Sequence, residues 1–393
     1  MRPFNHKSCF PWRSGCYFTL LVDGPRFFPR MLDAIREASD FICLEMYLME
    51  SGKVAGRFIT ALVAARQRGV RVFVLLDDFG SHALDQADRR RMTNAGIHLQ
   101  FFNPFRWQRL YASLPRDHRK LLLVDGELAF VGGAGITDEF QHPTRPALSW
   151  RETMVQIEGP VVQDWLDLFS RSWQQASGQP CHLPVVVPAA RQEDQLGRVS
   201  IAEGRGRQEI NRSLIKRSRN AERRIWICTP YFIVSRKLRH TLRRMARAGL
   251  DVRVMVPGPI SDHPWVRHAS RGYYTRLLRQ GVRIFEYQPR FLHAKIQLCD
   301  NWASIGSSNL DRWNQRWNLD ANQEIDDPRF ATAIAEMFEA DLRHCHEIRY
   351  EDWLIRPASQ RIREWFWGRC VRLLDVLVRL LQRRHTRRET DGD

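Results

Sequence analysis

The sequence has no run of 18 uncharged apolar residues, so we expect no helix that spans a bilayer. It also lacks an N-terminal apolar stretch followed by a small-residue cleavage site, so we expect no signal peptide and a cytosolic location. No two of the eight cysteines are spaced as CxxC, which excludes a zinc ribbon and a redox pair. Buried, reduced thiols are the expected state.

Lysine is scarce, although the chain of 393 residues is strongly basic. Lys plus Arg exceed Asp plus Glu by 61 to 44, giving a net charge of +17, and only six of the 61 are lysine. Because guanidinium groups bind phosphate bidentately, this charge suits nucleic acid, an anionic bilayer or a phosphate ester. A GC-rich genome explains the arginine bias equally well. The hydrophobic content of 44% excludes a disordered chain, a collagen and a coiled coil.

The chain contains two halves with the same order of predicted elements. Each half has an apolar run, a helical stretch, a buried-strand pattern, a second helix, a short strand and a strand that carries His-x-Lys. The apolar runs are 41–51 and 225–235, and the buried-strand patterns are 70–78 and 251–258. This alternation predicts an α/β fold of two duplicated lobes, each a mixed β-sheet flanked by helices.

Composition divides the chain into four parts. A segment rich in Pro and Gly separates the halves, and each half closes with an amphipathic helix, at 160–178 and 329–346. The predicted parts are an N-terminal lobe (1–179), a connector (180–208), a C-terminal lobe (209–350) and an amphipathic membrane-associated helix with a basic tail (351–393).

A pattern of His-x-Lys-x4-Asp occurs once in each half, at matching places. In a strand, side chains two residues apart lie on the same face, so each His and Lys are expected to project together. One such pair carries no information, whereas two at equivalent positions of a duplicated fold predict one shared active site. The residues are His118, Lys120 and Asp125 in the first half and His293, Lys295 and Asp300 in the second.

These residue types suit chemistry at phosphorus. A neutral imidazole can attack phosphorus, while a second histidine protonates the leaving oxygen and then deprotonates the incoming one. Lysine, serine and asparagine side chains can hold the phosphoryl oxygens, so we expect no metal and no cofactor. A carboxylate beside each histidine would fix its tautomer. Glu152 and Glu324 lie at similar distances downstream of the two histidines and are the tentative orienting residues; Asp320 is a rival.

The paired pattern resembles the phospholipase D superfamily over about residues 12–350. Closer details resemble bacterial cardiolipin synthases, in particular the B type without N-terminal membrane spans: TPYFIVS, HRKLLLVDGELAFVGG, WRET, LHAKIQLCD and GSSNLD. The resemblance implies two α/β lobes with the active site at their junction and a phosphohistidine intermediate. It further implies phosphatidyl transfer between two molecules of the anionic phospholipid phosphatidylglycerol, which gives cardiolipin and glycerol.

The resemblance also assigns roles to single residues. His118 would be the nucleophile and His293 the general acid and base. Asp125 and Asp300 belong to the catalytic motif, although we interpret both as anchors of the turn after each strand. The tyrosines Tyr47 and Tyr231 either line the pocket or are buried at the sheet ends. The residues expected to bind the substrate phosphate are Lys120, Lys295, Asn309 and Ser307.

Two positions depart from the family pattern. Gly135 stands where family members usually have Asn, which removes one phosphate donor. The hairpin between Asp300 and Gly306 is one residue shorter than usual. Both departures bear on rate or substrate preference, and neither removes a histidine or a lysine of the two motifs.

Residues 360–384 predict an amphipathic helix with aromatic and basic side chains, which is typical of an interfacial membrane anchor. Docking of this helix on its own lobe is the alternative. The aromatic, basic stretch 101–117 precedes His118 and forms either a lip over the site or a surface loop. We therefore expect peripheral association with the cytoplasmic face of a bacterial membrane. The apolar stripe is Ile362, Trp365, Phe366, Leu373, Val376, Leu377 and Leu380.

Three other functions use the same residues. Phospholipid hydrolysis replaces the lipid alcohol with water, and a nuclease cleaves the same kind of bond in a nucleic acid. The charge of +17 suits DNA, but no separate nucleic-acid module is evident, so no nucleic-acid partner is expected. A non-catalytic lipid-binding protein is disfavoured because both histidines and both lysines are present. The donor lipid and the oligomeric state stay open.

Overall fold

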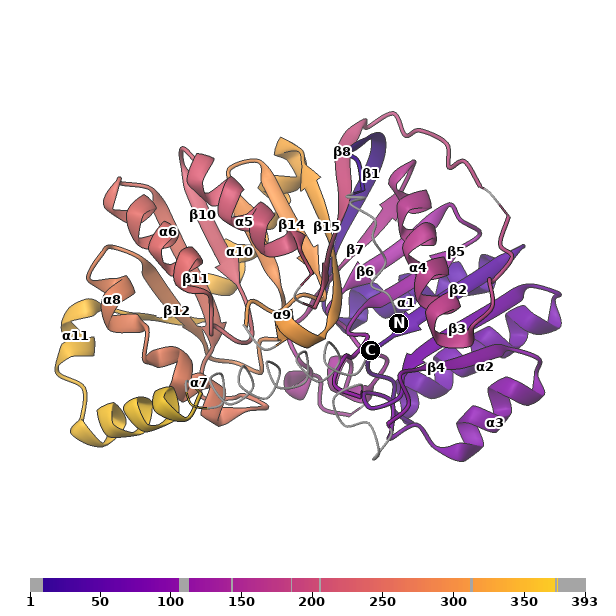
Figure 1. The fold of residues 1–393 in the computed structure, drawn as a ribbon, viewed down its shortest axis with the longest axis horizontal. Coiled ribbons are helices and arrows are strands. Elements are labelled where there is room, and N and C mark those ends of the chain that lie inside the picture. Colours follow the sequence, from indigo (N-terminus) through magenta and orange to yellow (C-terminus); the bar gives the residue numbers. More distant parts are fainter. Residues whose placement is uncertain are drawn as a thin grey trace, which may run out of the picture.

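A computed structural model describes residues 10–105, 113–142, 144–184, 186–204, 206–311, 314–371 and 373. Two lobes lie side by side, and the strands of both form one continuous sheet with helices on its faces (Figure 1). The predicted fold class, a mixed α/β structure of two lobes, is confirmed.

Lobe one contains seven strands and four helices among the described residues, with two short 3-10 turns before β7. They are β1 (Arg13–Val22), α1 (Gly24–Glu37), β2 (Phe41–Met46), α2 (Lys53–Gln67), β3 (Arg71–Asp77), α3 (Gln86–Asn94), β4 (His98–Phe102), β5 (Lys120–Val124), β6 (Leu128–Gly132), η2 (Asp138–Phe140), η3 (Pro146–Leu148), β7 (Thr153–Glu158) and α4 (Val161–Ser177).

Lobe two repeats this plan and extends it. Its elements are β8 (Gln195–Glu203), β9 (Arg207–Gln208), α5 (Glu209–Asn220), β10 (Arg224–Cys228), α6 (Arg236–Arg247), β11 (Asp251–Pro257), α7 (Pro264–Arg271), α8 (Tyr274–Leu278), β12 (Arg283–Tyr287), β13 (Ile296–Cys299), β14 (Trp302–Gly306), α9 (Asn314–Trp317), β15 (Leu319–Asp326), α10 (Pro328–Leu342), β16 (Cys345–Ile348) and α11 (Tyr350–Leu354).

The sheet order shows the duplication. Outward from the central pair, lobe one runs β1-β7-β6-β5-β2-β3-β4, and lobe two runs β8-β15-β14-β13-β10-β11-β12 before β16. In both lobes the last three strands of these series are parallel, and the others are antiparallel. All residues of β2 are buried, as expected for a parallel strand covered on both faces.

The predicted boundary between the lobes is wrong at one point. The sequence predicts a connector over residues 180–208, yet β8 lies within this range and is the first strand of lobe two. It pairs with β15 over its length and with β1 of lobe one. The surrounding Gly and Pro residues mask the alternation of this strand in the sequence. Similarly, the closing helix expected at 329–346 ends at Leu342, because Cys345 begins the edge strand β16.

One hydrophobic core runs through both lobes. The rings of Phe18 and Phe330 are in edge contact with their centroids 6.1 Å apart, although they come from opposite lobes. The indole of Trp165 in α4 donates a hydrogen bond of 2.8 Å to Gln323 in β15. Separate cores fill the opposite face of the sheet, under α1 and α2 in lobe one and under α5 and α6 in lobe two. Because the lobes share a core, residues at their junction are held in fixed relative positions.

The described part of the C-terminal segment is helical over residues 358–371 and runs along the lower edge of lobe two (Figure 1). Its carboxylate Glu364 is buried and forms ion pairs with Arg271 and Arg356. The predicted stripe residues Val376, Leu377 and Leu380 lie outside the described residues. Among the described residues, no helix is both long enough and apolar enough to cross a membrane.

Candidate active site

The two histidine motifs meet where the lobes join. His118 lies two residues before β5 and His293 three residues before β13, so both lie at the same end of the strands of the continuous sheet. The strands begin at Lys120 and Ile296, so the histidines lie just before the strands and not within them. Both are nearly buried, with 7% of His118 and 8% of His293 exposed.

His118 is paired with an acid from the other lobe. Its Nδ1 lies 2.9 Å from Oδ1 of Asp320, which is fully buried. The hydroxyl of Ser307 donates a hydrogen bond of 2.7 Å to the same carboxylate oxygen. The carboxylate therefore favours a proton on Nδ1 of His118 and leaves Nε2 with a free electron pair.

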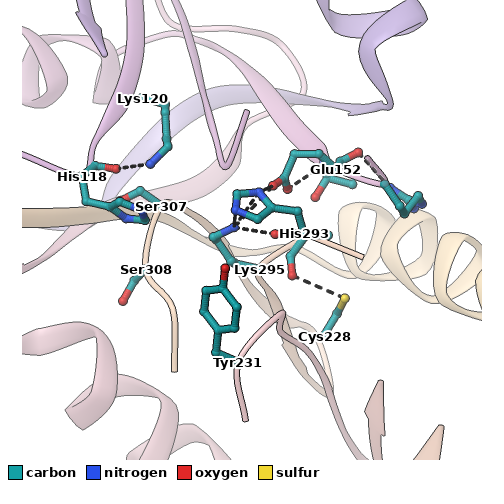
Figure 2. Close-up of polar contacts among 12 residues, drawn as sticks. His118, Lys120, Glu152, Cys228, Tyr231, His293, Lys295, Ser307 and Ser308 are labelled. Atoms are coloured by element: carbon teal, nitrogen blue, oxygen red, sulfur yellow. Dashed lines mark hydrogen bonds and ion pairs between the residues drawn. The ribbon is translucent and has the colours of Figure 1, made fainter. Parts of the chain in front are cut away.

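His293 is paired in the same crossed manner. Its Nδ1 lies 2.6 Å from Oε2 of Glu152, a buried lobe-one residue that immediately precedes β7. The ammonium group of Lys295 lies 3.4 Å from the same carboxylate oxygen (Figure 2). The structure thus brings Glu152 to a histidine, as its predicted orienting role requires.

Backbone contacts between the lobes produce this crossing. The residue before each acid forms a parallel bridge with the motif of the opposite lobe: Leu319 with Asp117, and Arg151 with Leu292. The amide of His118 donates to Leu319 O at 2.9 Å, and the amide of His293 donates to Arg151 O at 2.8 Å. Each acid is therefore placed by the chain that pairs with its histidine.

The prediction that Glu324 orients a histidine is wrong. Its carboxylate binds Arg198 at 2.9 Å and the Ser213 hydroxyl at 3.0 Å, four residues further along β15 than Asp320. Counting downstream from the histidines misleads because the segment from the end of β6 to Glu152 (133–152) is six residues longer than the segment from the end of β14 to Asp320 (307–320). The gapless match of ETMVQIE with DANQEID was the available signal, since it aligns Glu152 with Asp320.

The predicted phosphate ligands converge between the histidines. Lys120 Nζ donates to His118 O at 2.6 Å, and Lys295 Nζ lies 3.0 Å from Nδ1 of His293 (Figure 2). Asn309 is 2% exposed, and its Oδ1 has no hydrogen-bond partner among the described residues. Ser307 binds Asp320 and so supports a histidine, which differs from the expected contact with phosphate.

The two tyrosines lie at the site and not at remote sheet ends. The ring of Tyr47 lies 4.7 Å from the ring of His118 and 4.8 Å from Lys120 Nζ, measured to ring centroids. Tyr231 points toward Lys295 (Figure 2), and its hydroxyl donates a hydrogen bond to Asp262. Both tyrosines therefore line the site.

Asp125 and Asp300 face away from this chemistry. Asp125 accepts hydrogen bonds of 2.9 Å from the backbone amides of Ser39, Asp40 and Phe41. Asp300 likewise accepts bonds of 2.8 to 3.0 Å from the amides of residues 222–224. Each joins its hairpin turn to the start of the neighbouring strand. The geometry matches the turn-anchor interpretation, and grouping these two residues with the catalytic set is wrong.

The structure shows the surroundings of the two departures from the family pattern, which are Gly135 and the shorter hairpin of lobe two. A Cβ atom at Gly135 would lie 2.7 Å from the carbonyl oxygen of Leu48, so this backbone leaves no room for a side chain. The lobe-two hairpin turn spans residues 300–301, whereas the lobe-one turn spans 125–127. The turn after β6 therefore offers no side-chain donor for phosphate at Gly135.

Burial and the close approach of positively charged groups shift the pKa values of the ionisable residues in the site. Burial, with the nearby Lys120, lowers the pKa of His118 to about 4. Burial, with the nearby Lys295, lowers the pKa of Lys120 to about 7. The pKa values of His293 and Lys295 are lowered chiefly by burial as well. Burial opposes ionisation of Asp320, but the contacts with His118 and Ser307 and the nearby Lys120 together outweigh it and lower the pKa of this carboxyl. An anion between the lysines would relieve their repulsion, as a phosphodiester does.

Sequence reasoning missed a buried arginine that supports the second pair. Arg151 is 2% exposed and binds Asp341 of α10 with two hydrogen bonds, of 3.1 and 2.7 Å. Its Nη1 also donates to the carbonyl oxygen of Glu152 at 2.8 Å. The run WRET marked the region, but its partner in α10 is 190 residues away.

Comparison with known proteins agrees with the geometry. A family model described as "Cardiolipin synthase, PLD-like domain" matches residues 31–173 and 214–342. Cardiolipin synthase A of Pseudomonas putida is 34% identical over 337 residues, which is 85% of this chain and 69% of the relative. The major cardiolipin synthase ClsA of Bacillus subtilis is 32% identical over 353 residues, covering 88% and 73%.

Solved structures share the fold. The phosphatidylserine synthase of Haemophilus influenzae has a TM-score of 0.73 at 14% identity, covering 94% of this chain and 96% of that chain. The polyphosphate kinase of Porphyromonas gingivalis has a TM-score of 0.58 at 16% identity, covering 86% and 49%. At these identities the likeness concerns architecture alone.

Proposed function

The chain belongs to the cardiolipin synthase family with phospholipase D-like domains, and we propose that it transfers a phosphatidyl group from one phosphatidylglycerol to another. The products would be cardiolipin and glycerol. The observation that carries this proposal is the pair of His-Lys sites at the lobe junction, in which each histidine is held by a carboxylate from the opposite lobe. Whether the chain is of the B type stays a prediction.

The first step forms a covalent intermediate. His118 Nε2 attacks phosphorus, a P–N bond forms and the bond from phosphorus to the glycerol oxygen breaks. His293 gives its proton to that oxygen, so glycerol leaves as a neutral alcohol. Lys120, Lys295 and the amide group of Asn309 hold the oxygens that gain charge.

The second step reverses the first with a new alcohol. A hydroxyl of a second phosphatidylglycerol attacks phosphorus while His293 takes its proton. The P–N bond breaks and its electron pair returns to His118. Water in place of the lipid hydroxyl would give phosphatidic acid, which is the hydrolase alternative.

Substrate binding favours the protonated form of His293 that the first step needs, with the proton taken up from solvent. Burial and the nearby Lys295 lower the pKa of His293, which favours its neutral form before substrate binds. A phosphodiester anion beside both lysines raises the pKa of every cation around it. The imidazolium of His293 is thereby stabilised next to Glu152. His118, whose pKa burial lowers to about 4, keeps the electron pair on Nε2.

Exposed apolar side chains support action at a membrane surface. Large exposed apolar residues occur on loops that follow β3, β4, β6 and β11, at the end of the strands that carries the site. Others lie on the described C-terminal helix. Grouping at this end of the sheet suits an interfacial enzyme whose substrate stays in the bilayer. They are Phe79, Phe105, Leu114, Leu148 and Ile260 on the loops, and Ile362, Trp365, Phe366 and Leu373 on the helix; Val187, Leu354 and Ile355 are also exposed but lie outside these two groups.

The activity is tested with labelled phosphatidylglycerol in mixed micelles containing EDTA. Mass spectrometry should detect cardiolipin and released glycerol with the wild-type protein, and neither product with His118→Ala or His293→Ala. Phosphatidic acid as the only product would replace the synthase proposal with hydrolysis. No turnover, also with phosphatidylethanolamine as co-substrate, would remove both and direct the search to nucleic-acid substrates.

Membrane contact has its own test, by sedimentation with phosphatidylglycerol vesicles. The double variant Trp365→Ala and Phe366→Ala should weaken binding, because these side chains are 59% and 52% exposed on the helix. Val187→Ala is the matched control, since Val187 is 86% exposed but lies in the connector. Equal binding by all three proteins would contradict the proposed surface.

A further inference from the structure

We propose that Asp262, held by Tyr231, forms a subsite for the alcohol head group of the substrate, accepting hydrogen bonds from its hydroxyl or ammonium donors. This inference rests on the proposed function, because it concerns the alcohol that leaves at the His293 side of the site. It names a specificity determinant that neither the paired motifs nor their carboxylates supply.

Asp262 lies on the loop after β11, at the same end of the strands as the histidines. The Tyr231 hydroxyl donates to its Oδ2, and Nε2 of His263 lies 3.8 Å from the same oxygen. Among the described residues, Oδ1 of Asp262 accepts no hydrogen bond, and the side chain is 19% exposed. One carboxylate oxygen is thus anchored while the other can accept a donor from a ligand.

The position of Asp262 relative to the catalytic groups selects its ligand. Tyr231 points toward Lys295 beside His293 (Figure 2). The negative charge of Asp262 acts on both His293 and Lys295, raising the pKa values that burial lowers. A carboxylate repels the phosphodiester anion itself, so it cannot be a phosphate ligand. The part of the substrate that it suits is the alcohol, which carries hydrogen-bond donors in glycerol and in ethanolamine.

Lobe one has no matching arrangement among its described residues, which assigns the alcohol to lobe two. Tyr47 is the counterpart of Tyr231, but its ring packs against Lys120 and His118. The corresponding loop after β3 carries Asp78, whose carboxylate accepts a hydrogen bond of 3.0 Å from the backbone of Phe105. The alcohol would therefore lie beside His293, the residue that must protonate it.

The test measures single-turnover release of the head alcohol, which reports the first half-reaction alone. Three lipids are compared in the same micelles: phosphatidylglycerol, phosphatidylethanolamine and phosphatidylpropanol, whose alcohol has no donor. The variants are Asp262→Ala, Tyr231→Phe and, as a loop-charge control, Asp78→Asn. Phosphatidylpropanol also serves as an internal measure of folding and of the catalytic groups.

The wild type should release glycerol or ethanolamine about ten- to a hundredfold faster than propanol, the value of one hydrogen bond to a charged group. Asp262→Ala should lower that rate to the propanol rate of the same variant and so abolish the preference. Any loss that propanol release shares reports the missing negative charge beside His293 and Lys295. Tyr231→Phe should reduce the preference partly, and Asp78→Asn should keep it. If glycerol release falls more than ethanolamine release in Asp262→Ala, the preferred donor is a hydroxyl group. If ethanolamine release falls more, the preferred donor is the ammonium group.

Two results would overturn the subsite. Equal release of all three alcohols by the wild type shows that no donor is recognised. An equal loss on all three lipids in Asp262→Ala shows a structural or electrostatic role only. Failure of the proposed function looks different, because the wild type would then release no alcohol from any lipid.

Discussion

The two histidine sites differ in the length of the orienting acid and in the residue that stands beside it. In lobe two a short acid, Asp320, is supported by the hydroxyl of Ser307 at 2.7 Å. The equivalent position in lobe one is Gly133, and a Cβ atom there would lie 2.3 Å from the carboxylate of Glu152. A longer acid therefore fills the space that an aspartate and a serine hydroxyl share on the other side.

This difference separates the two histidines chemically. The carboxyl pKa of Asp320 is lowered by His118 and Ser307 despite its burial. Burial raises the carboxyl pKa of Glu152, although Lys295 opposes the shift. A more basic carboxylate holds the proton of an imidazolium more firmly. Duplication alone would give equal sites, so the unequal acids favour one nucleophile and one acid-base residue.

The largest expected effect comes from breaking either histidine. His118→Ala and His293→Ala should each reduce kcat by about 10⁴- to 10⁶-fold, as loss of a nucleophile or its base does in other enzymes. A phosphodiester with a nitrophenolate leaving group needs no acid, so it should still label His118 in the His293→Ala variant. Labelling of His293 in the His118→Ala variant instead would reverse the assigned roles.

The carboxylates come next. Asp320→Asn and Glu152→Gln should each lower kcat by about 10²- to 10⁴-fold, because the histidine loses its tautomer and the imidazolium its counter-charge. Glu324→Gln is the matched control: this buried acid pairs with Arg198, so its loss should lower the unfolding temperature and leave kcat close to wild type. A large loss of kcat in Glu324→Gln with normal activity in Asp320→Asn would restore the rejected residue.

Gly133 and Ser307, which lie beside Glu152 and Asp320, provide a further test of the difference between the two sites. Gly133→Ala should cost about 10²-fold in kcat, because the new methyl group must displace the carboxylate of Glu152. Ser307→Ala should cost only about tenfold, since Asp320 keeps its contact with His118. Steady-state rates of both variants with wild-type KM would check this order. Equal losses would show that the two acids are held alike.

The pH profile of kcat/KM tests the charge states of the site. Activity should fall below pH of about 4, where protonation removes the Nε2 electron pair of His118. It should also fall as the pH rises through the lowered pKa of His293, which must carry a proton to act as the acid. A further fall is expected above pH of about 7, where Lys120 loses the proton that binds phosphate. Asp320→Asn should move the acid limb to lower pH, because this carboxylate raises the His118 pKa. An unmoved limb would mean that another group controls it.

Much of this architecture could be predicted from sequence because it depends on local patterns. The apolar runs of β2 and β10 and the doubled histidine motif are by themselves enough to indicate two similar lobes. The strand β8 could not be found in this way, because it gains its place from pairing with β15 and β1 across the lobe boundary. Its own residues give only a weak alternation.

In the candidate site, too, local sequence patterns predict some residues, and contacts between distant segments determine the others. Histidines and lysines follow from the motif, whereas the acids depend on loop lengths that distance counting ignores. Asp320 lies four residues before Glu324 on the same strand. Glu324 is paired with Ser304 of β14, whereas Asp320 lies beyond the last residue that pairs with β14. The crossed arrangement cannot be inferred from either half alone, since bridges such as Arg151 with Leu292 join different lobes.

The smallest effect on activity is expected at the motif aspartates, where the two lobes are alike. Asp125→Ala or Asp300→Ala removes an acceptor of three backbone amides, which should cost about 1–2 kcal/mol of unfolding free energy, as loss of a helix cap does. Thermal unfolding should detect this loss in both variants, while kcat per folded molecule stays close to wild type. A loss of kcat comparable to that of the histidine variants, with unchanged unfolding, would return these aspartates to the catalytic set. Because both sit at positive φ, of 53° and 51°, asparagine is the substitution that keeps the turn while it removes the charge.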